Sequence, residues 1–517
     1  MTLLQWLKGT FANNCPRPRR KTSVLLEVEG LEVRTVPSTS GQLVWTGSGN
    51  ASNANNWTNP VSHQHFVPTA TDQLLYGDGG LGANTPCTWD FTNQTVDRVI
   101  MDSHYTATLT IPSGNTLHTT NYFEQYGTLS MSGTATVSAG GYIDINGAVS
   151  ASSGTTSHLD ASGSFFLFTS ATITTTGAAA LEITSANFSD SGTISVGTAT
   201  VAGTLTIAGP FTQSAGSISL LPGSALTFGS QGRPSAYPIF QGTGSTVTTT
   251  PGTTIATDTQ LAFSGATLNA VGAGAHTIAG IGGSGGNLRV YNTGVINVGT
   301  ASPTLATVLT VSTGSVTVGA LDPNGTGTGG TLNLYATTTL AMPAAASPST
   351  FDVTALGVIN MRGATITMAT ARVANLNIHM GGSGLANGQL NSLGAPALGD
   401  VIAGNVVNNG TIAFGGAALH ALGITAATGG GFYTQGPTGT LAMRLDNGEV
   451  NDVLTVAATA TLNGTLSLSG LNPLTALQTW DLIGAAAIGG DFQTRIWPDG
   501  GTWVSAVGPP YSVTKAA

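Results

Sequence analysis

Residues 192–220 read GTISVGTATVAGTLTIAGPFTQSAGSISL, and one short phrase occurs in them three times. Each copy begins with glycine and a small polar residue and continues with alternating apolar and polar residues. Side chains alternate between the two faces of a β-strand, so one copy predicts a turn followed by a strand with one buried face. In the first copy, Ile194 and Val196 would point to one side and Ser195 to the other.

The phrase recurs along most of the chain. Further copies are GTLSM at 127, GVINV at 294, GSVTV at 314, GTLNL at 330, GTIAF at 410, GTLAM at 439 and GTLSL at 464. We interpret one copy as a facet of a coil and two or three facets as a full turn, and a repeat of about 20–50 residues is typical of a solenoid. The sequence therefore predicts an all-β fold, a right-handed parallel β-helix (β-solenoid) with terminal caps.

A β-sandwich built from hairpins is the competing all-β fold. Asn-Gly pairs are typical of two-residue hairpin turns, and they occur at 146–147, 324–325, 387–388, 409–410, 447–448 and 463–464. The near-identical phrases favour the solenoid instead, because stacked coils with in-register neighbours bury a continuous apolar column.

Tryptophans lie near the two ends of the repetitive region, and none occurs between Trp89 and Trp480. The end coils of a solenoid expose an apolar cross-section and open strand edges. We therefore expect the tryptophans to cover these ends. The alternative is carbohydrate stacking on exposed Trp45, Trp57 or Trp503.

Charge is scarce in this chain. Charged residues make up 7% of the 517 residues, against roughly 25% in ordinary soluble proteins. Six of the fourteen Lys and Arg lie within residues 1–34, and the only later lysine is Lys515. With no basic patch in the body, no nucleic-acid partner is expected.

The chain contains no run of 18 apolar residues, so no transmembrane helix is predicted. The two cysteines, Cys15 and Cys87, make no disulfide framework, and Cys87 is expected to be a small buried hydrophobe.

Residues 1–38 are expected to form a basic, flexible leader. Residues 19–21 read RRK and residues 26–38 read LEVEGLEVRTVPS. This combination resembles the leader of large exported proteins of planctomycete bacteria, and the resemblance implies export to the cell surface or the extracellular space. A disordered basic tail is the alternative.

Three further segments are expected. Residues 39–125 would form the N-terminal coils and cap, 126–430 the repetitive β-helix, and 431–517 a C-terminal closing β element. The order VWTG at 44–47, NNW at 55–57, Pro68 and Asp72 resembles the opening of autotransporter-passenger-like β-helix proteins. NDVLTV at 451–456, NGTLSL at 463–468 and WDLI at 480–483 resemble the closing autotransporter-associated β-strand element, with Ala458 where that family often has glycine.

Catalytic chemistry has little visible support in the sequence. Polysaccharide lyases and glycoside hydrolases with β-helix folds need converging carboxylates, and the arginines of this body are widely spaced. His158 and Asp160 are expected to be two exposed polar residues. Asp97, Arg98 and Asp102 are expected to form an exposed, salt-bridged surface. His63 and His65 have the spacing of metal ligands but no third ligand nearby.

Two denser clusters are interpreted as turns. Arg444, Asp446, Glu449 and Asp452 lie in the region of the closing element, with Arg444 and Asp446 expected to project away from Met443 and Leu445. The loop at 322–327, with Asp322 and Asn324, has oxygens for a weakly held structural Ca²⁺, although a turn explains the same residues without metal. The glycine-rich loop at 282–286 lacks the strand–helix context of a phosphate-binding loop. No catalytic, cofactor-binding or metal-ligating residue is assigned.

These observations predict an exported structural or adhesin-like β-helix protein of the bacterial cell surface. Its working feature would be an uncharged side wall of Thr, Ser and Asn that makes weak multivalent contacts with glycans or other surface proteins. The alternatives are a β-helix polysaccharide lyase or glycoside hydrolase whose carboxylate site is not evident from spacing, and a structural module without a ligand.

Overall fold

The computed structural model describes residues 41–152, 154–229, 238–281, 285–302, 305–312, 314–319, 328–342, 350–368, 375–378, 388–394, 399–426 and 430–517. Gly41–Ala517 forms one compact unit. The leader, Cys15 and the loop at 322–327 lie outside the described residues, as do Arg233, Arg372 and most of the loop at 282–286. Described residues of the segments expected at 39–125, 126–430 and 431–517 all lie within this unit, and the boundaries between the segments stay predictions.

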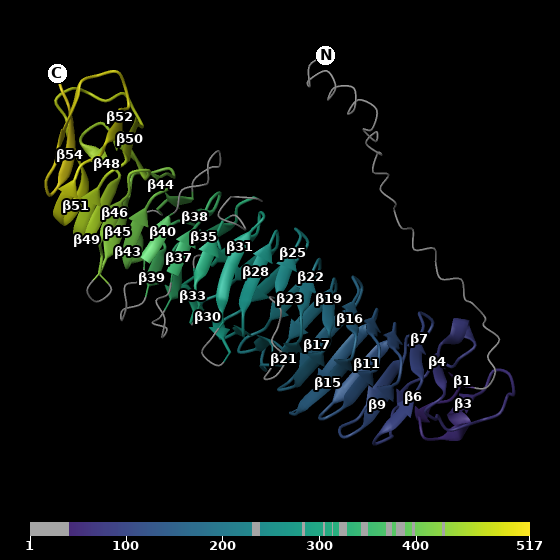
Figure 1. Cartoon of the computed structure of the whole chain (residues 1–517). Helices are drawn as coiled ribbons and strands as arrows, with labels where there is room; N and C mark the ends of the chain where they lie inside the picture. The colour runs from purple at the N-terminus through teal and green to yellow at the C-terminus, as the bar shows by residue number, and fades with distance from the viewer. Residues whose placement is uncertain are drawn as a thin grey trace, which may run out of the picture. The chain divides into compact units, whose positions relative to one another are not determined.

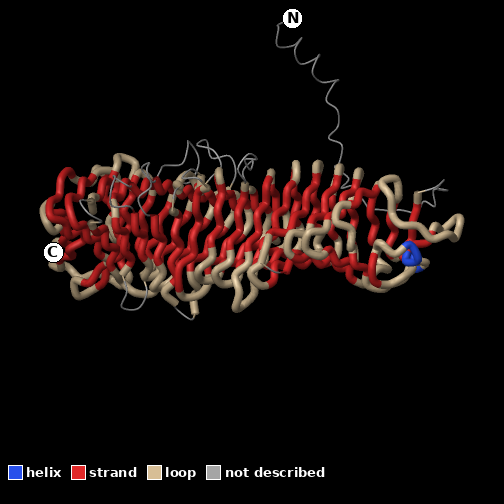
Figure 2. The backbone as a smooth tube through the Cα atoms, turned by 90° about the horizontal axis from the view of Figure 1, so that it is seen from below, coloured by secondary structure: helices blue, strands red, loops and turns tan. Residues whose placement is uncertain are grey.

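The described chain is a β-solenoid of about 15 turns with three strands per coil. Away from the two ends, strands pair in parallel with the third strand before and the third strand after in the chain, as β11 does with β8 and β14. The pairing produces three ladders along the stack, and Figures 1 and 2 show strands of successive coils lying side by side. The predicted all-β solenoid is confirmed, and the sandwich is wrong.

Ladder 1 contains β1 (Gln42–Trp45), β4 (Gln73–Tyr76), β7 (Arg98–Met101), β10 (Phe123–Gln125), β13 (Ile143–Ile145), β16 (Ser164–Leu167), β19 (Asn187–Asp190), β22 (Phe211–Gln213), β25 (Ile239–Gln241), β28 (Gln260–Ser264), β31 (Asn287–Tyr291), β34 (Val316–Val318), β37 (Thr350–Val353), β40 (Asn375–Ile378), β43 (Asn405–Asn408) and β46 (Tyr433–Gln435). Ladder 2 contains β2 (Gly49–Asn50), β5 (Cys87–Thr88), β8 (Thr108–Ile111), β11 (Thr128–Ser132), β14 (Ala148–Ser152), β17 (Thr172–Thr176), β20 (Thr193–Val196), β23 (Ser217–Leu220), β26 (Thr246–Thr249), β29 (Thr267–Ala270), β32 (Val295–Val298), β35 (Thr331–Leu334), β38 (Val358–Met361), β41 (Gln389–Ser392), β44 (Thr411–Phe414), β47 (Thr440–Asp446), β50 (Thr465–Gly470) and β52 (Thr494–Ile496). Ladder 3 contains β6 (Gln94–Val96), β9 (Thr116–Thr119), β12 (Thr136–Ala139), β15 (Thr156–Ala161), β18 (Ala180–Thr184), β21 (Thr204–Ala208), β24 (Ala225–Phe228), β27 (Thr254–Thr257), β30 (Gly274–Gly280), β33 (Thr307–Val311), β36 (Thr339–Met342), β39 (Thr365–Met368), β42 (Asp400–Ala403), β45 (Ala421–Thr425), β49 (Val453–Leu462) and β51 (Thr479–Gly490). The second half of β49 also continues ladder 1, because it pairs with β46.

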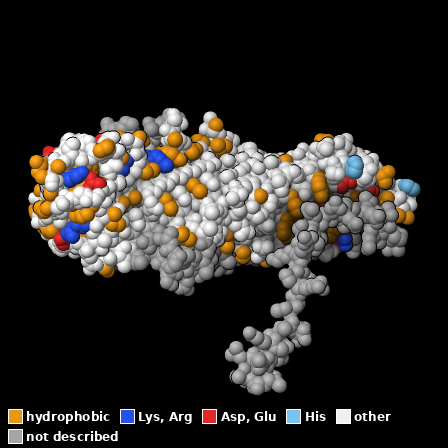
Figure 3. Space-filling model, turned by 90° about the horizontal axis from the view of Figure 1, so that it is seen from above, with side chains coloured by type: hydrophobic (Ala, Val, Ile, Leu, Met, Phe, Trp, Pro, Cys, Tyr) orange, Lys and Arg blue, Asp and Glu red, His pale blue; other side chains and the backbone are white. Residues whose placement is uncertain are grey.

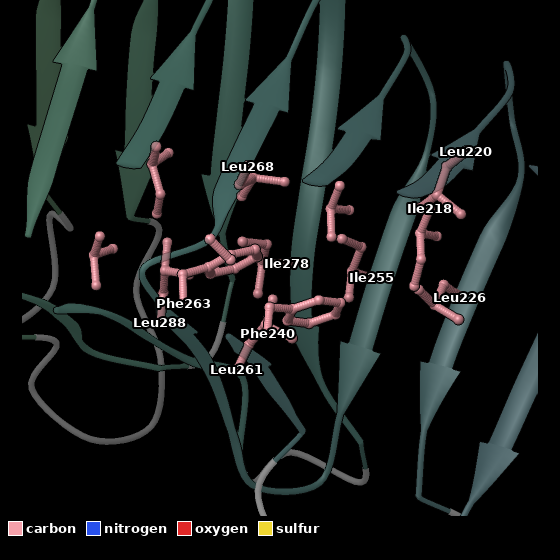
Figure 4. Close-up of a cluster of buried hydrophobic side chains, with 14 of the residues drawn as sticks. Ile218, Leu220, Leu226, Phe240, Ile255, Leu261, Phe263, Leu268, Ile278 and Leu288 are labelled. Carbon is pink, nitrogen blue, oxygen red and sulfur yellow. The ribbon is translucent and has the colours of Figure 1, made fainter. Parts of the chain in front are cut away.

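The alternation of side chains places the core inside the coil. In β20, Ile194 and Val196 are fully buried while Thr193 and Ser195 face outward, as the phrase predicts. Figure 4 shows apolar side chains of successive coils meeting in the interior. Within this column Phe188 lies between Phe165 and Phe211, with ring centroids 4.7 and 5.2 Å away. Burial of the column is the main stabilising contribution to the fold.

The Asn-Gly pairs serve two different turns. The pairs at 146–147, 409–410 and 463–464 are corners between parallel strands of one coil. At the first corner, a Cβ on Gly147 would overlap the carbonyl oxygens of Gly127 and Tyr126 in the preceding coil, so only glycine permits this close approach. The pair at 447–448 is a true hairpin turn, joining β47 to the antiparallel β48 (Val450–Asn451). Residues 324, 325 and 387 lie outside the described residues.

Aromatic residues close the N-terminal end. β3 (Trp57–Thr58) pairs with β1 in antiparallel fashion, and two short 3-10 helices, η1 (Ala54–Asn56) and η2 (Asp78–Gly80), lie in the same region. Trp45 and Trp57 are fully buried, with ring centroids 5.0 Å apart, and their indole N–H groups donate to the carbonyls of Thr85 and Ala51. The alternative of carbohydrate stacking on Trp45 or Trp57 is therefore wrong, because no part of either ring is exposed.

An antiparallel hairpin covers the C-terminal end. β54 (Tyr511–Lys515) pairs with the first half of β51 and with β53 (Trp503–Ala506). Trp503 stacks on Trp497 with ring centroids 5.4 Å apart and also contacts the buried Trp480. Both ends of the stack thus carry the expected aromatic caps. Among the described residues, no helix is long and apolar enough to cross a membrane.

Candidate functional site

The outer surface of ladder 1 carries a cluster of aromatic and acidic side chains, which we call the aromatic–carboxylate patch. It is formed by outward-facing residues of β7, β10, β13 and β16 and of the corners beside them. Its members are Arg98, Tyr122, Glu124, Tyr126, Tyr142, Asp144, Phe166 and Phe168.

Two carboxylates are direct neighbours at the centre of the patch. Glu124 of β10 is in register with Asp144 of β13, on adjacent coils about 4.8 Å apart. Burial raises the pKa of Asp144 from 3.8 to about 6, and the neighbouring charge of Glu124 adds to this. Burial also raises the pKa of Glu124. One carboxyl of the pair therefore holds a proton more readily than an isolated aspartate would.

The described structure provides no counter-charge to this pair. No hydrogen bond or ion pair to Glu124 or Asp144 is found among the described residues, and Oδ1 of Asp144 is buried without a hydrogen-bond partner. Arg98, the basic residue of the patch, donates from Nε to Asp97 at 2.8 Å and lies over the ring of Tyr122, 5.1 Å from its centroid. Its charge is thus already paired.

Aromatic rings lie beside the carboxylates, and Ile100 of β7 is the in-register neighbour of Glu124 on the other side. Tyr122 and Tyr142 stack face to face, with ring centroids 4.8 Å apart and an interplanar angle of 3°. Phe166 is the in-register neighbour of Asp144 on the next coil, and its ring is 6.3 Å from that of Phe168. Phe168 is 42% exposed and Tyr126 is 43% exposed, so the patch presents apolar rings to solvent.

The sequence does contain a signal for this patch, although spacing between charges did not reveal it. Residues 122–128 read YFEQYGT and residues 142–148 read YIDINGA, so tyrosine and acid occupy equivalent positions of two phrases 20 residues apart. One coil at this point is 20 residues long, since Thr108 pairs with Thr128. Aligning the phrases by coil would have placed both acids side by side.

Ladder 2 presents a different surface, which we call the hydroxyl–amide face. Its outward positions carry Thr and Ser on β8, β11, β17, β20, β23 and β26, and then asparagine on β29, β32, β35, β38 and β41. The asparagines form a continuous ladder of side-chain hydrogen bonds: Asn297 to Asn269 at 2.8 Å, Asn333 to Asn297 at 2.9 Å, Asn360 to Asn333 at 2.9 Å and Asn391 to Asn360 at 2.8 Å. In Figure 3, charged side chains gather toward the two ends of the visible surface and are rare between them.

Ladder 3 carries a small polar row. His158 and Asp160 both face outward around the buried Leu159, as the sequence predicts. Nδ1 of His158 lies 3.4 Å from Oε2 of Glu182 on the next coil, and Nδ1 of His118 lies 2.7 Å from the hydroxyl of Ser138. These contacts join residues on adjacent coils. Among the described residues, no third metal ligand lies with either histidine.

The C-terminal charge cluster is structural, with one correction. Arg444 does not project into solvent: it is only 8% exposed, and it lies against the loop before β45. Its guanidinium donates to Asp452 from Nε at 2.8 Å and to the carbonyls of Gly416 and Ala418 at 2.6 and 2.7 Å. Asp452 is fully buried, and the pair joins this loop to the start of β49.

The other two acids of that cluster hold the backbone of the cap. Asp446 accepts from the side chain of Asn472 at 2.7 Å, and Glu449 accepts from the backbone N–H of Thr479 at 3.2 Å. Neither carboxylate joins the Arg444–Asp452 pair, so the cluster predicted from sequence divides into a buried pair and two surface contacts.

A serine and a histidine near this pair have the spacing of a nucleophile and its base. Nε2 of His420 lies 3.0 Å from the hydroxyl of Ser392, and Nδ1 lies 3.9 Å from Asp452. The hydroxyl of Ser392, however, also donates to Asp400 at 2.7 Å, and both Ser392 and Asp400 are buried. A nucleophilic serine must be reachable and must give its proton to the histidine, so this network is part of the packing.

The N-terminal candidates also serve the fold. Nδ1 of His65 contacts the carbonyl of Trp57 at 2.9 Å, while His63 is exposed. Asp102 accepts from the backbone N–H of Gly79 at 2.7 Å and is not the partner of Arg98. Cys87 is buried, which raises the pKa of its thiol to about 12. Across the described residues, no group of three His, Cys, Asp or Glu has metal-binding geometry.

No known family model matches the chain, and no curated protein matches it.

Proposed function

We propose that this protein is an exported structural β-solenoid of the bacterial cell surface that contacts glycans or other surface proteins through its side wall. The hydroxyl–amide face is the observation that carries this proposal. Its outward residues from β8 to β41 are uncharged on every coil, and they repeat at the strand spacing of about 4.8 Å. Repeated weak contacts to a polymer add up through multivalency, because each one raises the effective concentration for the next.

Export is supported by the composition of the leader and by its resemblance to the leaders of planctomycete exported proteins. Fractionation of cells that produce the full chain tests this part. We expect the protein in the surface or extracellular fraction, and recovery of the intact chain only from the cytosol would contradict it.

The side-wall contact is tested by introducing charge. Lysines at Ser195 and Ser219 place two cations on the hydroxyl–amide face, and lysines at Thr206 and Thr227 place the same charge on ladder 3 as a control. Binding to immobilised neutral polysaccharides should fall at least tenfold only for the first variant. Equal losses for both variants would indicate a charge effect with no preferred face.

The carboxylate pair favours a second function, lysis or hydrolysis of a polysaccharide. Glycoside cleavage uses a carboxylic acid with a raised pKa beside a second, ionised carboxylate, and the pKa of about 6 of Asp144 beside Glu124 is the observation that favours this function. Release of reducing ends from polysaccharides, abolished by Glu124→Gln or Asp144→Asn, would establish this activity. Intact polysaccharide that remains bound to the protein would favour the adhesive function instead.

A further inference from the structure

The aromatic–carboxylate patch contains an electrostatic imbalance. Glu124 and Asp144 are in register on adjacent coils, and Arg98 is already paired with Asp97. Two like charges at this separation repel each other, more strongly where rings exclude water. Oδ1 of Asp144 is buried without a donor, which is uncommon in folded proteins, and the other three oxygens of the pair also have no donor among the described residues. The patch lacks a cationic hydrogen-bond donor.

We propose that the aromatic–carboxylate patch binds the free ammonium group of an amino sugar in a glycan chain. This inference rests on the proposed glycan-binding function and names the sugar class for one site. Glu124 and Oδ2 of Asp144 accept hydrogen bonds from the ammonium, and the rings of Tyr126, Phe166 and Phe168 pack against the apolar faces of the sugars.

The chemistry of the ammonium matches the pair. An ammonium has three donors and no acceptor, while two carboxylates have only acceptors. Hydrogen bonds between opposite charges are shorter and about twice as strong as neutral ones. Aromatic faces add attraction for a cation, and the tyrosines beside the pair supply such faces. An acetylated amine would have one N–H and no charge, so it would lose most of this interaction.

The form of the surface favours a sugar chain. The patch crosses several coils, from β7 to β16, and each coil offers a new rung about 4.8 Å further on. This is close to the length of one sugar unit, so consecutive sugars meet consecutive rungs. The exposed rings of Phe168 and Tyr126 lie at the corners that follow β16 and β10 and add apolar surface to the patch.

Calorimetric titration of the full chain with two matched probes tests the inference. The probes are the hexamer of glucosamine and the hexamer of N-acetylglucosamine, in buffer just above the pKa of about 6 of Asp144, so that this carboxyl is ionised while free amines still carry charge. We expect the wild type to bind the glucosamine hexamer at least tenfold more tightly. The double variant Glu124→Gln, Asp144→Asn should bind both hexamers alike, and Glu182→Gln, which removes an acid from ladder 3, should behave as wild type.

The outcomes separate the two proposals. Equal affinity of the wild type for both hexamers overturns the ammonium site and leaves the glycan-binding function standing. Absence of binding to every glycan probe overturns both. Oligolysine that binds as tightly as the glucosamine hexamer, and equally depends on Glu124 and Asp144, overturns the sugar assignment. Circular dichroism identical to wild type shows that the double variant is folded.

Discussion

Asp190 is predicted to make the middle of the solenoid less stable as the pH rises. This carboxyl lies fully inside the coil, where it accepts hydrogen bonds from the backbone N–H of Gly192 at 2.8 Å and from the amide of Gln213 at 3.1 Å. Desolvation outweighs these bonds and raises the pKa of Asp190 from 3.8 to about 7. The folded coil therefore holds a proton that the unfolded chain has already released between about pH 4 and pH 7.

The magnitude follows from proton linkage. Each pKa unit corresponds to about 1.4 kcal/mol, so a shift of about 3 units costs about 4 kcal/mol once the pH exceeds both values. The cost is absent below about pH 4 and complete above about pH 7. Between pH 5 and pH 8 the opening free energy of the coils around Asp190 should fall by about 3 kcal/mol.

Hydrogen exchange measured by mass spectrometry on peptides from 187–220 gives this local free energy. It suits a stacked protein better than a global melt, because coils far apart need not open together. After correction for the intrinsic pH dependence of exchange, Asp190→Asn should remove most of the change and should protect these peptides better than wild type at pH 8. Asp160→Asn, on the outer surface of ladder 3, is the control. The same pH dependence in wild type and Asp190→Asn would refute the reasoning.

Three further changes test the packing by the same exchange measurement. Gly216→Ala should lower local stability by more than 2 kcal/mol, because its φ is +79° and the new Cβ would overlap the carbonyl oxygen of Gly192, whereas Gly154→Ala, with open space around it, should change little. Phe211→Ala should cost about 3–5 kcal/mol, since it leaves a cavity in the aromatic column, and a loss below 1 kcal/mol would argue against tight packing there. Arg444→Met should cost about 3–5 kcal/mol by leaving Asp452 buried without its partner, and unchanged protection of peptides from 416–456 would contradict this.

The repeating phrase predicts both the strands and the buried face of each, because the alternation of a strand is a local property. Ile194 and Val196 are buried and Ser195 faces outward, as their positions in the phrase require. The tryptophans predict the caps for a different reason: the end coils expose apolar surface, and large rings near the ends of the repetitive region can cover it.

The site depends on coil length, which local alternation does not specify. Coils vary from the 20 residues that separate Thr108 from Thr128 to the 38 that separate Gly49 from Cys87. Only the stacked structure therefore shows which outward residues are neighbours. It places Glu124 beside Asp144, where burial and mutual repulsion raise the pKa of Asp144.

Burial of charge is likewise a tertiary property. The position of Arg444 in its strand indicated an outward side chain, but the loop carrying Gly416 and Ala418 covers the guanidinium and supplies its acceptors. The sequence by itself determined a stack of half-buried strands with closed ends. The alternation of apolar and polar residues and the size of the side chains can both be seen within a single strand segment. The tertiary structure alone decided which side chains from different coils meet, because contact between coils depends on loop lengths that the repeating phrase leaves free.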